Sequence, residues 1–238
     1  MPDPGYFRSF LARTDDRTLY KMDHYLDIYD RQLGGWQGRD VSFLEIGVYK
    51  GGSLRMWREF FAPAARLTFA DIDPGCKALE LPGTQIRIGD QSDPNFLATL
   101  AQDRGPFDLI VDDGGHQMLQ QIISFQHLWP HLRPGGLYIV EDTHTSYWPG
   151  FGGGHRAPAS FIEFAKDLID KMHSWYTEDD AGFPLHPMAS EIGSIQFHDS
   201  LVIVEKTRKP QPVSITSRNG QTERSDRILK IRGRRSIF

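Results

Sequence analysis

A glycine-rich turn between an apolar run and an amphipathic segment constrains this chain more than any other feature. Residues 43–53 read Phe-Leu-Glu-Ile-Gly-Val-Tyr-Lys-Gly-Gly-Ser, and apolar residues then recur at helical spacing as far as Phe61. This pattern predicts a strand, a tight turn and a helix. Glycine lets a backbone approach a ligand closely, and the start of a helix offers free N–H groups to it. We therefore expect a ligand site at this turn.

The glycine spacing argues against a dinucleotide as that ligand. The dinucleotide fingerprint is G-x-G-x-x-G, whereas here Gly47 is followed after three residues by Gly51 and Gly52. Glu45, two residues before the first glycine, would repel a pyrophosphate and attract an ammonium group. The spacing therefore disfavours a nicotinamide-dependent dehydrogenase.

The pattern E-x-G-x-x-x-G-G-S from Glu45 to Ser53 resembles motif I of the class I S-adenosylmethionine (SAM) methyltransferases. Their cofactor carries an amino group and a sulfonium but no phosphate. The resemblance implies that SAM is the ligand at this turn.

Strand and helix patterns alternate along the chain. Strands are predicted over 41–48, 66–73, 85–90, 107–113 and 137–140, helices over 15–33, 95–102, 117–132 and 161–175, and a terminal hairpin over 192–197 and 201–206. Alternation of this kind indicates βαβ units and a parallel sheet. We predict an α/β fold: a Rossmann-like, doubly wound, mostly parallel seven-stranded sheet with a terminal antiparallel hairpin. The predicted parts are an N-terminal helical cap (1–39), a methyltransferase domain (40–206) and a basic tail (207–238).

Carboxylates gather where the predicted strands end, which is where open α/β sheets bind ligands. They are Glu45, Asp71, Asp73, Asp90, Asp112, Asp113, Glu141 and Asp142. Close like charges raise each other's pKa and cost stability. We therefore expect a cationic ligand at this edge of the sheet.

Part of this set matches the needs of SAM. An acid at the end of the second strand can accept hydrogen bonds from ribose hydroxyls; Asp71 stands where methyltransferases place it, and Asp73 is the alternative. Asp90 resembles the acid that meets the adenine amino group, although it could instead cap a helix or form a turn. The residues predicted to contact the cofactor are Glu45, Gly47, Tyr49, Gly51, Ser53, Asp71, Asp73, Asp90, Gln91 and Asp112.

Three acids remain at the ends of the fourth and fifth strands. Asp113, Glu141 and Asp142 offer hard oxygen ligands that suit Mg²⁺ or a similar divalent cation. The alternative is that they are solvated loop acids without a metal.

Two further motifs sharpen the resemblance. One is the Asp-Asp-Gly-Gly-His block at 112–116, and the other is the Val-Glu-Asp-Thr block at 140–143 with the aromatic and glycine-rich stretch that follows. Both look like motifs of the metal-dependent O-methyltransferases of macrolide and other natural-product sugars. The related cephalosporin-hydroxylase-like group shares them. The resemblance covers roughly residues 14–206. It implies that Asp113, Glu141 and Asp142 bind the metal and that His116 is the general base, with His144 as a weaker second base or ligand.

The implied activity is SAM- and metal-dependent O-methylation of a sugar moiety or a polyhydroxylated natural product. Two alternatives stay open. One is methylation of catechol-type acceptors, whose adjacent hydroxyls chelate the metal. The other is SAM binding without methyl transfer.

Charge is distributed unevenly. Residues 206–238 carry a net charge of +8, so the rest of the chain carries −12 of the overall −4. The acidic body argues against a nucleic-acid partner, and we expect the tail to be solvated and partly disordered, or to act as an arm in a homo-oligomer.

A single cysteine, Cys76, excludes an intrachain disulfide, and no membrane-spanning run or secretory signal is visible. We expect a cytoplasmic protein.

Overall fold

A seven-stranded sheet forms the centre of the computed structural model, which describes residues 5–13 and 17–226. In chain order the strands are β1 (Ser42–Ile46), β2 (Arg66–Asp71), β3 (Thr84–Ile88), β4 (Phe107–Asp112), β5 (Leu132–Val140), β6 (Ile192–His198) and β7 (Leu201–Lys206). Their order across the sheet is β3-β2-β1-β4-β5-β7-β6. The strands β1 to β5 pair in parallel, and β7 is antiparallel to both β5 and β6. The predicted fold class is confirmed.

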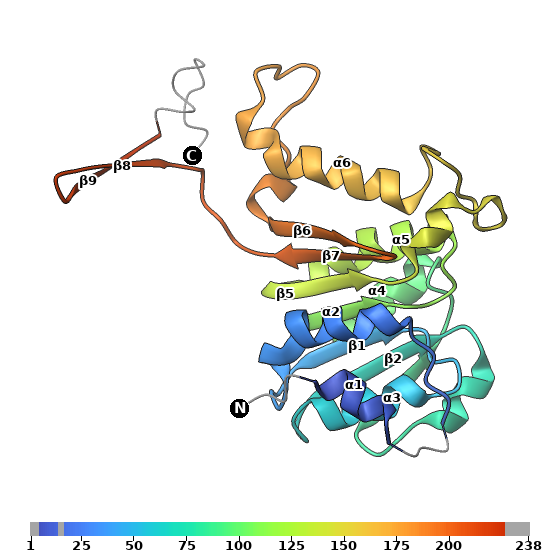
Figure 1. Cartoon of the computed structure of the whole chain (residues 1–238). Coiled ribbons are helices and arrows are strands. Elements are labelled where there is room, and N and C mark those ends of the chain that lie inside the picture. Colours follow the sequence, from blue (N-terminus) through green and yellow to red (C-terminus); the bar gives the residue numbers. More distant parts are fainter. Residues whose placement is uncertain (1–4, 14–16, 227–238) are drawn as a thin grey trace.

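Helices cover both faces of this sheet (Figure 1). They are α1 (Tyr6–Leu11), α2 (Asp23–Leu33), α3 (Gly52–Phe60), α4 (Pro94–Arg104), α5 (Met118–Leu128) and α6 (Phe161–His173). Short 3₁₀ helices are η1 (Gly34–Trp36), η2 (Pro74–Leu79), η3 (Trp129–His131), η4 (Thr143–Tyr147), η5 (Pro149–Phe151), η6 (Ser174–Tyr176) and η7 (Pro187–Ser190). None of the helices in the described part of the chain is both long and apolar enough to cross a membrane.

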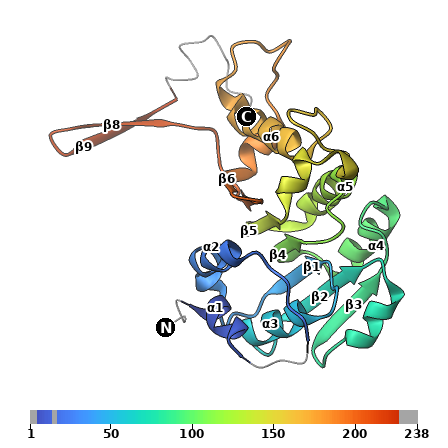
Figure 2. The same cartoon turned by 45° about the vertical axis from the view of Figure 1, so that its right-hand side comes forward.

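The two faces have separate hydrophobic cores. One joins α1, α2 and α3 to the sheet, and the other joins α4, α5 and α6 to it. Figure 2 shows the arrangement of these helices around the sheet from a second side. Successive residues of β4 alternate between them: Leu109 and Val111 face the first core, and Ile110 faces the second. Because side chains of a strand point alternately to its two faces, a strand buried on both sides must be apolar throughout.

The order of the strands fixes where a ligand can bind. The chain adds β2 and β3 on one side of β1 and then crosses to add β4 on the other. In open α/β sheets, ligands bind outside the carboxyl ends of the strands at such a switch point, which here lies at the loops after β1 and β4.

The N-terminal helix differs from its prediction. It was expected over 15–33, but α2 begins at Asp23, and residues 17–22 contain no helix or strand; residues 14–16 lie outside the described residues. The backbone of Thr18 and Leu19 instead passes directly over Gly52. Tertiary contacts here override the apolar periodicity, and the short helix α1 was not predicted.

A second, two-stranded sheet lies in the basic tail. Its strands β8 (Ser214–Arg218) and β9 (Gln221–Ser225) are joined by Asn219 and Gly220, which both have positive φ. That is the backbone that a tight hairpin turn requires. The hairpin projects from the body in Figures 1 and 2. The predicted tail therefore contains regular structure as far as β9, whereas residues 227–238 lie outside the described residues.

Candidate active site

The glycines of the turn between β1 and α3 accommodate the protein's own backbone. Gly47 has φ +100°, and a Cβ added to it would lie 1.9 Å from the carbonyl oxygen of Asp113. A Cβ on Gly52 would lie 2.5 Å from the backbone nitrogen of Leu19. The turn is thus packed between the loop after β4 and the N-terminal segment, and larger residues would separate them.

Glu45 is buried beneath this turn. Its carboxylate accepts hydrogen bonds from Ser53 Oγ at 2.6 Å and from Trp57 Nε1 at 2.9 Å, so it joins the end of β1 to the first turns of α3. Burial raises the pKa of Glu45 to about 7. Gly51, in a left-handed conformation, precedes the helix. Glu45 and Ser53, which were predicted to contact the cofactor, therefore stabilise the turn through a buried hydrogen bond, and Gly51 forms part of the turn itself.

A cavity of about 310 Å³ opens at the carboxyl ends of β1, β2, β3 and β4. Among the residues predicted for the cofactor, it is lined by Gly47, Tyr49, Asp71, Asp73, Asp90 and Gln91. Ile72 and Gly114 contribute apolar surface and backbone. A mostly apolar cleft with a few acids at a topological switch point is typical of nucleoside-binding sites.

The acids in this cavity also shape its walls. Asp71 Oδ2 accepts hydrogen bonds from the backbone of Val48 at 2.8 Å and of Tyr49 at 3.2 Å. Asp90 Oδ1 accepts from both the backbone nitrogen and the hydroxyl of Ser92 at 2.7 Å. The turn expected as an alternative for Asp90 is therefore present, and the residue faces the cavity as well.

Gln91 and Asp112 hold the loop that follows β4. Gln91 Nε2 donates to Asp112 Oδ1 at 2.9 Å, and Gln91 Oε1 accepts from the backbone of Gly115 at 2.8 Å. Asp112 is fully buried and does not line the cavity, and burial raises its pKa to about 6. Asp112, which was predicted to contact the cofactor, is therefore buried behind the residues that line the cavity.

A second cavity of about 350 Å³ adjoins the first. It is lined by Tyr20, Lys21, Met22, Tyr25, Tyr49, Asp113, Gly114, His116, Glu141 and Asp142. Tyr49, Asp113 and Gly114 line both cavities. A group bound in one cavity would therefore be next to a group bound in the other.

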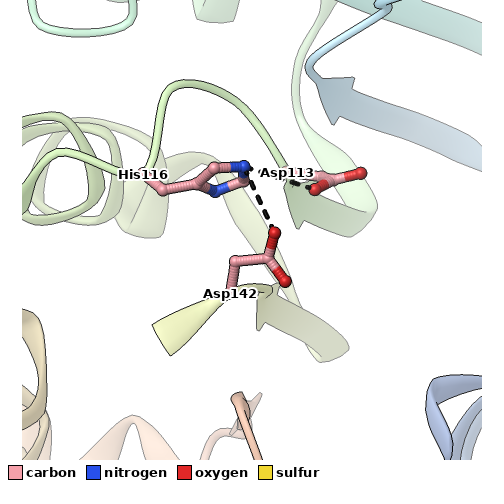
Figure 3. A group of neighbouring side chains, drawn as sticks. All are labelled: Asp113, His116 and Asp142. Atoms are coloured by element: carbon pink, nitrogen blue, oxygen red, sulfur yellow. Dashed lines mark ion pairs between the residues drawn. The ribbon is translucent and has the colours of Figure 1, made fainter. Parts of the chain in front are cut away.

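Asp113, His116 and Asp142 converge on the second cavity (Figure 3). His116 Nε2 lies 3.4 Å from Asp142 Oδ2 and 3.9 Å from Asp113 Oδ1. One ligand atom from each residue lies within 4.8 Å of the other two. Carboxylate oxygens with an imidazole nitrogen at this spacing fit a divalent cation. His144 does not line this cavity, and its Nδ1 lies 2.5 Å from Ser200 Oγ.

Two of these residues have a conformation that is rare for residues other than glycine. His116 has φ +56° and Asp142 has φ +53°. Each such residue costs of order 1–3 kcal/mol and persists only where its surroundings hold it. Tyr25 of α2 stabilises this conformation of Asp142. Its hydroxyl donates to Asp142 Oδ1 at 2.8 Å and accepts from the Asp142 N–H at 3.1 Å. Strain concentrated in this way is typical of functional sites.

Glu141 lines the same cavity but is not part of this group, and it pairs with a lysine. The ammonium of Lys21 lies 2.6 Å from Glu141 Oε1, 2.6 Å from Asp113 Oδ2 and 3.7 Å from Glu45 Oε1. The hydroxyl of Tyr29 also donates to Glu141. Burial and the charge of Asp113 raise the pKa of Glu141 to about 8. Three acidic side chains therefore surround a single ammonium.

Lys21 is the site residue that the sequence did not reveal. Its side chain is 2% exposed. Burial lowers the pKa of Lys21, but the charges of Asp113, Glu141 and Glu45 outweigh burial and raise that pKa well above its usual value. Its partners lie as far as 120 residues away along the chain, so no local pattern connects them.

Comparison with known proteins agrees with this geometry. Residues 44–143 match a family profile described as a methyltransferase domain. The chain is 37% identical over 211 residues to 8-demethyl-8-alpha-L-rhamnosyl tetracenomycin-C 2'-O-methyltransferase of Streptomyces olivaceus, covering 85% of this chain and 55% of that protein. It is 39% identical over 194 residues to mycinamicin VI 2''-O-methyltransferase of Micromonospora griseorubida, covering 77% and 48%. The chain thus spans about half the length of these curated relatives.

A solved structure shows the same arrangement of elements. The MycE methyltransferase of the mycinamycin pathway, in complex with Mg and SAH, superposes with a TM-score of 0.75 at 32% identity, over 87% of this chain and 55% of that one. An O-methyltransferase from Bacillus cereus in complex with SAH, at 12% identity and a TM-score of 0.52, shares the fold. Residues 44–143 therefore resemble a methyltransferase domain, and the chain is similar, over about half of their length, to sugar O-methyltransferases of antibiotic pathways.

Proposed function

We propose that this protein is a SAM-dependent, divalent-metal-dependent O-methyltransferase that acts on a hydroxyl of a sugar moiety or a polyhydroxylated natural product. The observation that carries the proposal is the pair of adjoining cavities. One presents Asp71 and Asp90 at the strand ends, and the other presents Asp113, His116 and Asp142. A methyl donor in the first and an acceptor in the second would meet beside Asp113.

The relatives support this assignment of donor and acceptor. The named curated relatives act on the sugars of tetracenomycin- and mycinamicin-type compounds. The MycE structures contain Mg and SAH, and one of them also contains mycinamycin VI. The acids at the strand ends of the first cavity suit an adenosyl cofactor, and the carboxylates and imidazole of the second suit a divalent cation.

SAM would occupy the first cavity. Asp71 would accept from the ribose hydroxyls and Asp90 from the adenine amino group, because both carboxylates line that cavity and follow neighbouring strands. The aminoacyl end would lie along the turn after β1, over Tyr49 and towards the acidic cluster. Carboxylates there favour a cationic sulfonium over its neutral product.

Asp113 and Asp142 would hold the divalent cation, with His116 or Glu141 beside them. The set of carboxylate oxygens and an imidazole nitrogen fits such an ion. When bound, the metal would lower the pKa of an acceptor hydroxyl and orient its oxygen.

His116 Nε2 would receive the proton of the acceptor hydroxyl. Asp142, 3.4 Å from that nitrogen, would stabilise the imidazolium that results. The walls shared by the two cavities would hold the acceptor oxygen in line with the methyl group. Correct alignment of this kind accounts for a large part of the rate of such transfers.

Transfer of a labelled methyl group from SAM tests the proposal. Rhamnosylated polyketides, macrolide glycosides and catechols serve as acceptors, each assayed with Mg²⁺ and after exhaustive chelation. We expect glycoside methylation that chelation abolishes and Mg²⁺ restores, retained in His131→Ala, which changes an exposed histidine on η3. Methylation of catechols alone would change the acceptor class, and full activity after chelation would refute the metal site. SAM binding without transfer to any acceptor would favour a non-catalytic role.

A further inference from the structure

Residues 17–22 form an N-terminal strap across the mouth of the site. The strap joins α1 to α2 and has neither helical nor strand structure. Its backbone at Thr18 and Leu19 passes over Gly52 at the start of α3. Tyr20 and Lys21 then line the second cavity. The strap therefore lies against both the glycine turn and the acidic cluster.

Lys21 fixes the inner side of the strap. Its ammonium lies 2.6 Å from Asp113 Oδ2 and 2.6 Å from Glu141 Oε1. Divalent cations bind carboxylate oxygens at roughly 2.0–2.6 Å, so an ion bound to these same two oxygens would occupy the position of the ammonium. Two cations cannot share it.

We propose that Lys21 and the divalent cation compete for Asp113 and Glu141, so that Lys21 sets the metal affinity and metal loading releases the strap. The inference rests on the proposed function, because it requires that a metal binds. Once Lys21 has left, Asp113, Glu141 and Asp142 become available together, which is the ligand set predicted from the sequence. The acidic cluster would thus have two alternative occupants, of which the structure shows Lys21.

The strap is built so that this exchange can occur. It has no helix or strand pairing to break, and its Tyr20 side chain is 72% exposed. Irregular segments at the surface open at lower free-energy cost than core strands and helices. A lysine ammonium on a flexible four-carbon stem also recovers its hydration when it moves to solvent. Opening would break the ion pairs of Lys21 and the hydrogen bond from Arg17 to the Leu79 carbonyl oxygen. It would also remove the packing of Leu19 and Met22 against the first core.

Binding of Mn²⁺ alone, measured by electron paramagnetic resonance of the free ion, tests the competition. Lys21→Met keeps the length of the side chain and removes its charge. We expect Lys21→Met to bind Mn²⁺ roughly tenfold or more tightly than wild type, a gain of about 1.4 kcal/mol. Lys50→Met is the matched control, since Lys50 is exposed and lies over the Tyr49 ring at 5.3 Å; it should change the affinity less than about twofold. Equal or weaker binding by Lys21→Met would overturn the proposal.

Hydrogen exchange of the unmodified protein provides a second test that needs no variant. Mn²⁺ should accelerate exchange of the amides of residues 17–22 and leave those of β1 unchanged. Slower or unchanged exchange in the strap would show that it does not open on loading. If wild type binds no Mn²⁺, the metal requirement of the proposed function fails as well. If wild type binds Mn²⁺ and Lys21→Met binds it no better, only the role of Lys21 fails.

Discussion

Replacing Tyr25 by phenylalanine tests whether the second cavity is held in a working conformation by α2. The Tyr25 hydroxyl lies 2.8 Å from Asp142 Oδ1 and from the Ser200 carbonyl oxygen, and it accepts from the Asp142 N–H. Its removal leaves a partly buried carboxylate and a backbone N–H without this partner. Asp142, at φ +53°, would then lose the contact that opposes its backbone strain.

The size of the effect follows from the kind of bond that is lost. A hydrogen bond to a charged group contributes roughly 1.5–3 kcal/mol to stability. For a domain of this size, each kcal/mol lowers the melting temperature by about 2–4 °C. We therefore expect Tyr25→Phe to lower the melting temperature by about 3–12 °C and to weaken Mn²⁺ binding, because Asp142 is one of the proposed ligands. SAM affinity should be unchanged, since Tyr25 does not line the first cavity.

Tyr6→Phe is the matched control for this experiment. The Tyr6 hydroxyl is also buried, but it donates to the uncharged carbonyl oxygen of Met56, at 2.9 Å and outside both cavities. It should cost only about 0.5–1.5 kcal/mol of stability and leave Mn²⁺ binding unaltered. Calorimetry and Mn²⁺ titration of both variants give the comparison. The reasoning is wrong if Tyr25→Phe is no less stable than Tyr6→Phe and binds Mn²⁺ like wild type.

Three further predictions concern single side chains of the site. Asp71→Ala should weaken SAM binding by about 1.5–3 kcal/mol, and an unchanged affinity in calorimetry would exclude Asp71 as the ribose ligand. His116→Ala should lower the rate of methyl transfer by roughly 10²–10⁴-fold with little change in SAM affinity; near-normal turnover would remove His116 as the base. Gly47→Ala should destabilise the fold, because the added methyl would meet the Asp113 carbonyl oxygen at 1.9 Å. A wild-type melting temperature in Gly47→Ala would show that the two loops can separate without cost.

Local patterns in the sequence were enough to predict the sheet and one edge of the site. The spacing of apolar residues in a strand or a helix follows from the backbone geometry of that element. The order of the elements can therefore be predicted without knowing the tertiary contacts. Acids that end parallel strands must meet at one edge, since all these strands point the same way. For this reason Asp71, Asp90, Asp113 and Asp142 were correctly expected at one rim, and the two cavities confirm that they gather there.

The roles of individual residues at that rim depended on packing instead. Asp112 and Asp113 are neighbours in the sequence, yet Asp112 is fully buried and Asp113 faces both cavities, because successive side chains around a strand end point to opposite sides. In the same way, the neighbours Glu141 and Asp142 have different partners: Glu141 pairs with Lys21, and Asp142 lies beside His116.

Contacts between distant parts of the chain were decided only by the tertiary structure. The sequence by itself determined a methyltransferase-type sheet, a glycine turn and a ring of carboxylates, because those features are local or follow from strand direction. It did not determine that the first turns of the expected N-terminal helix are a strap, that Lys21 neutralises acids as far as 120 residues away, or that Tyr25 holds Asp142. Buried ion pairs of this kind carry no periodic signal, since their energy depends on burial and distance, which exist only once the chain has folded.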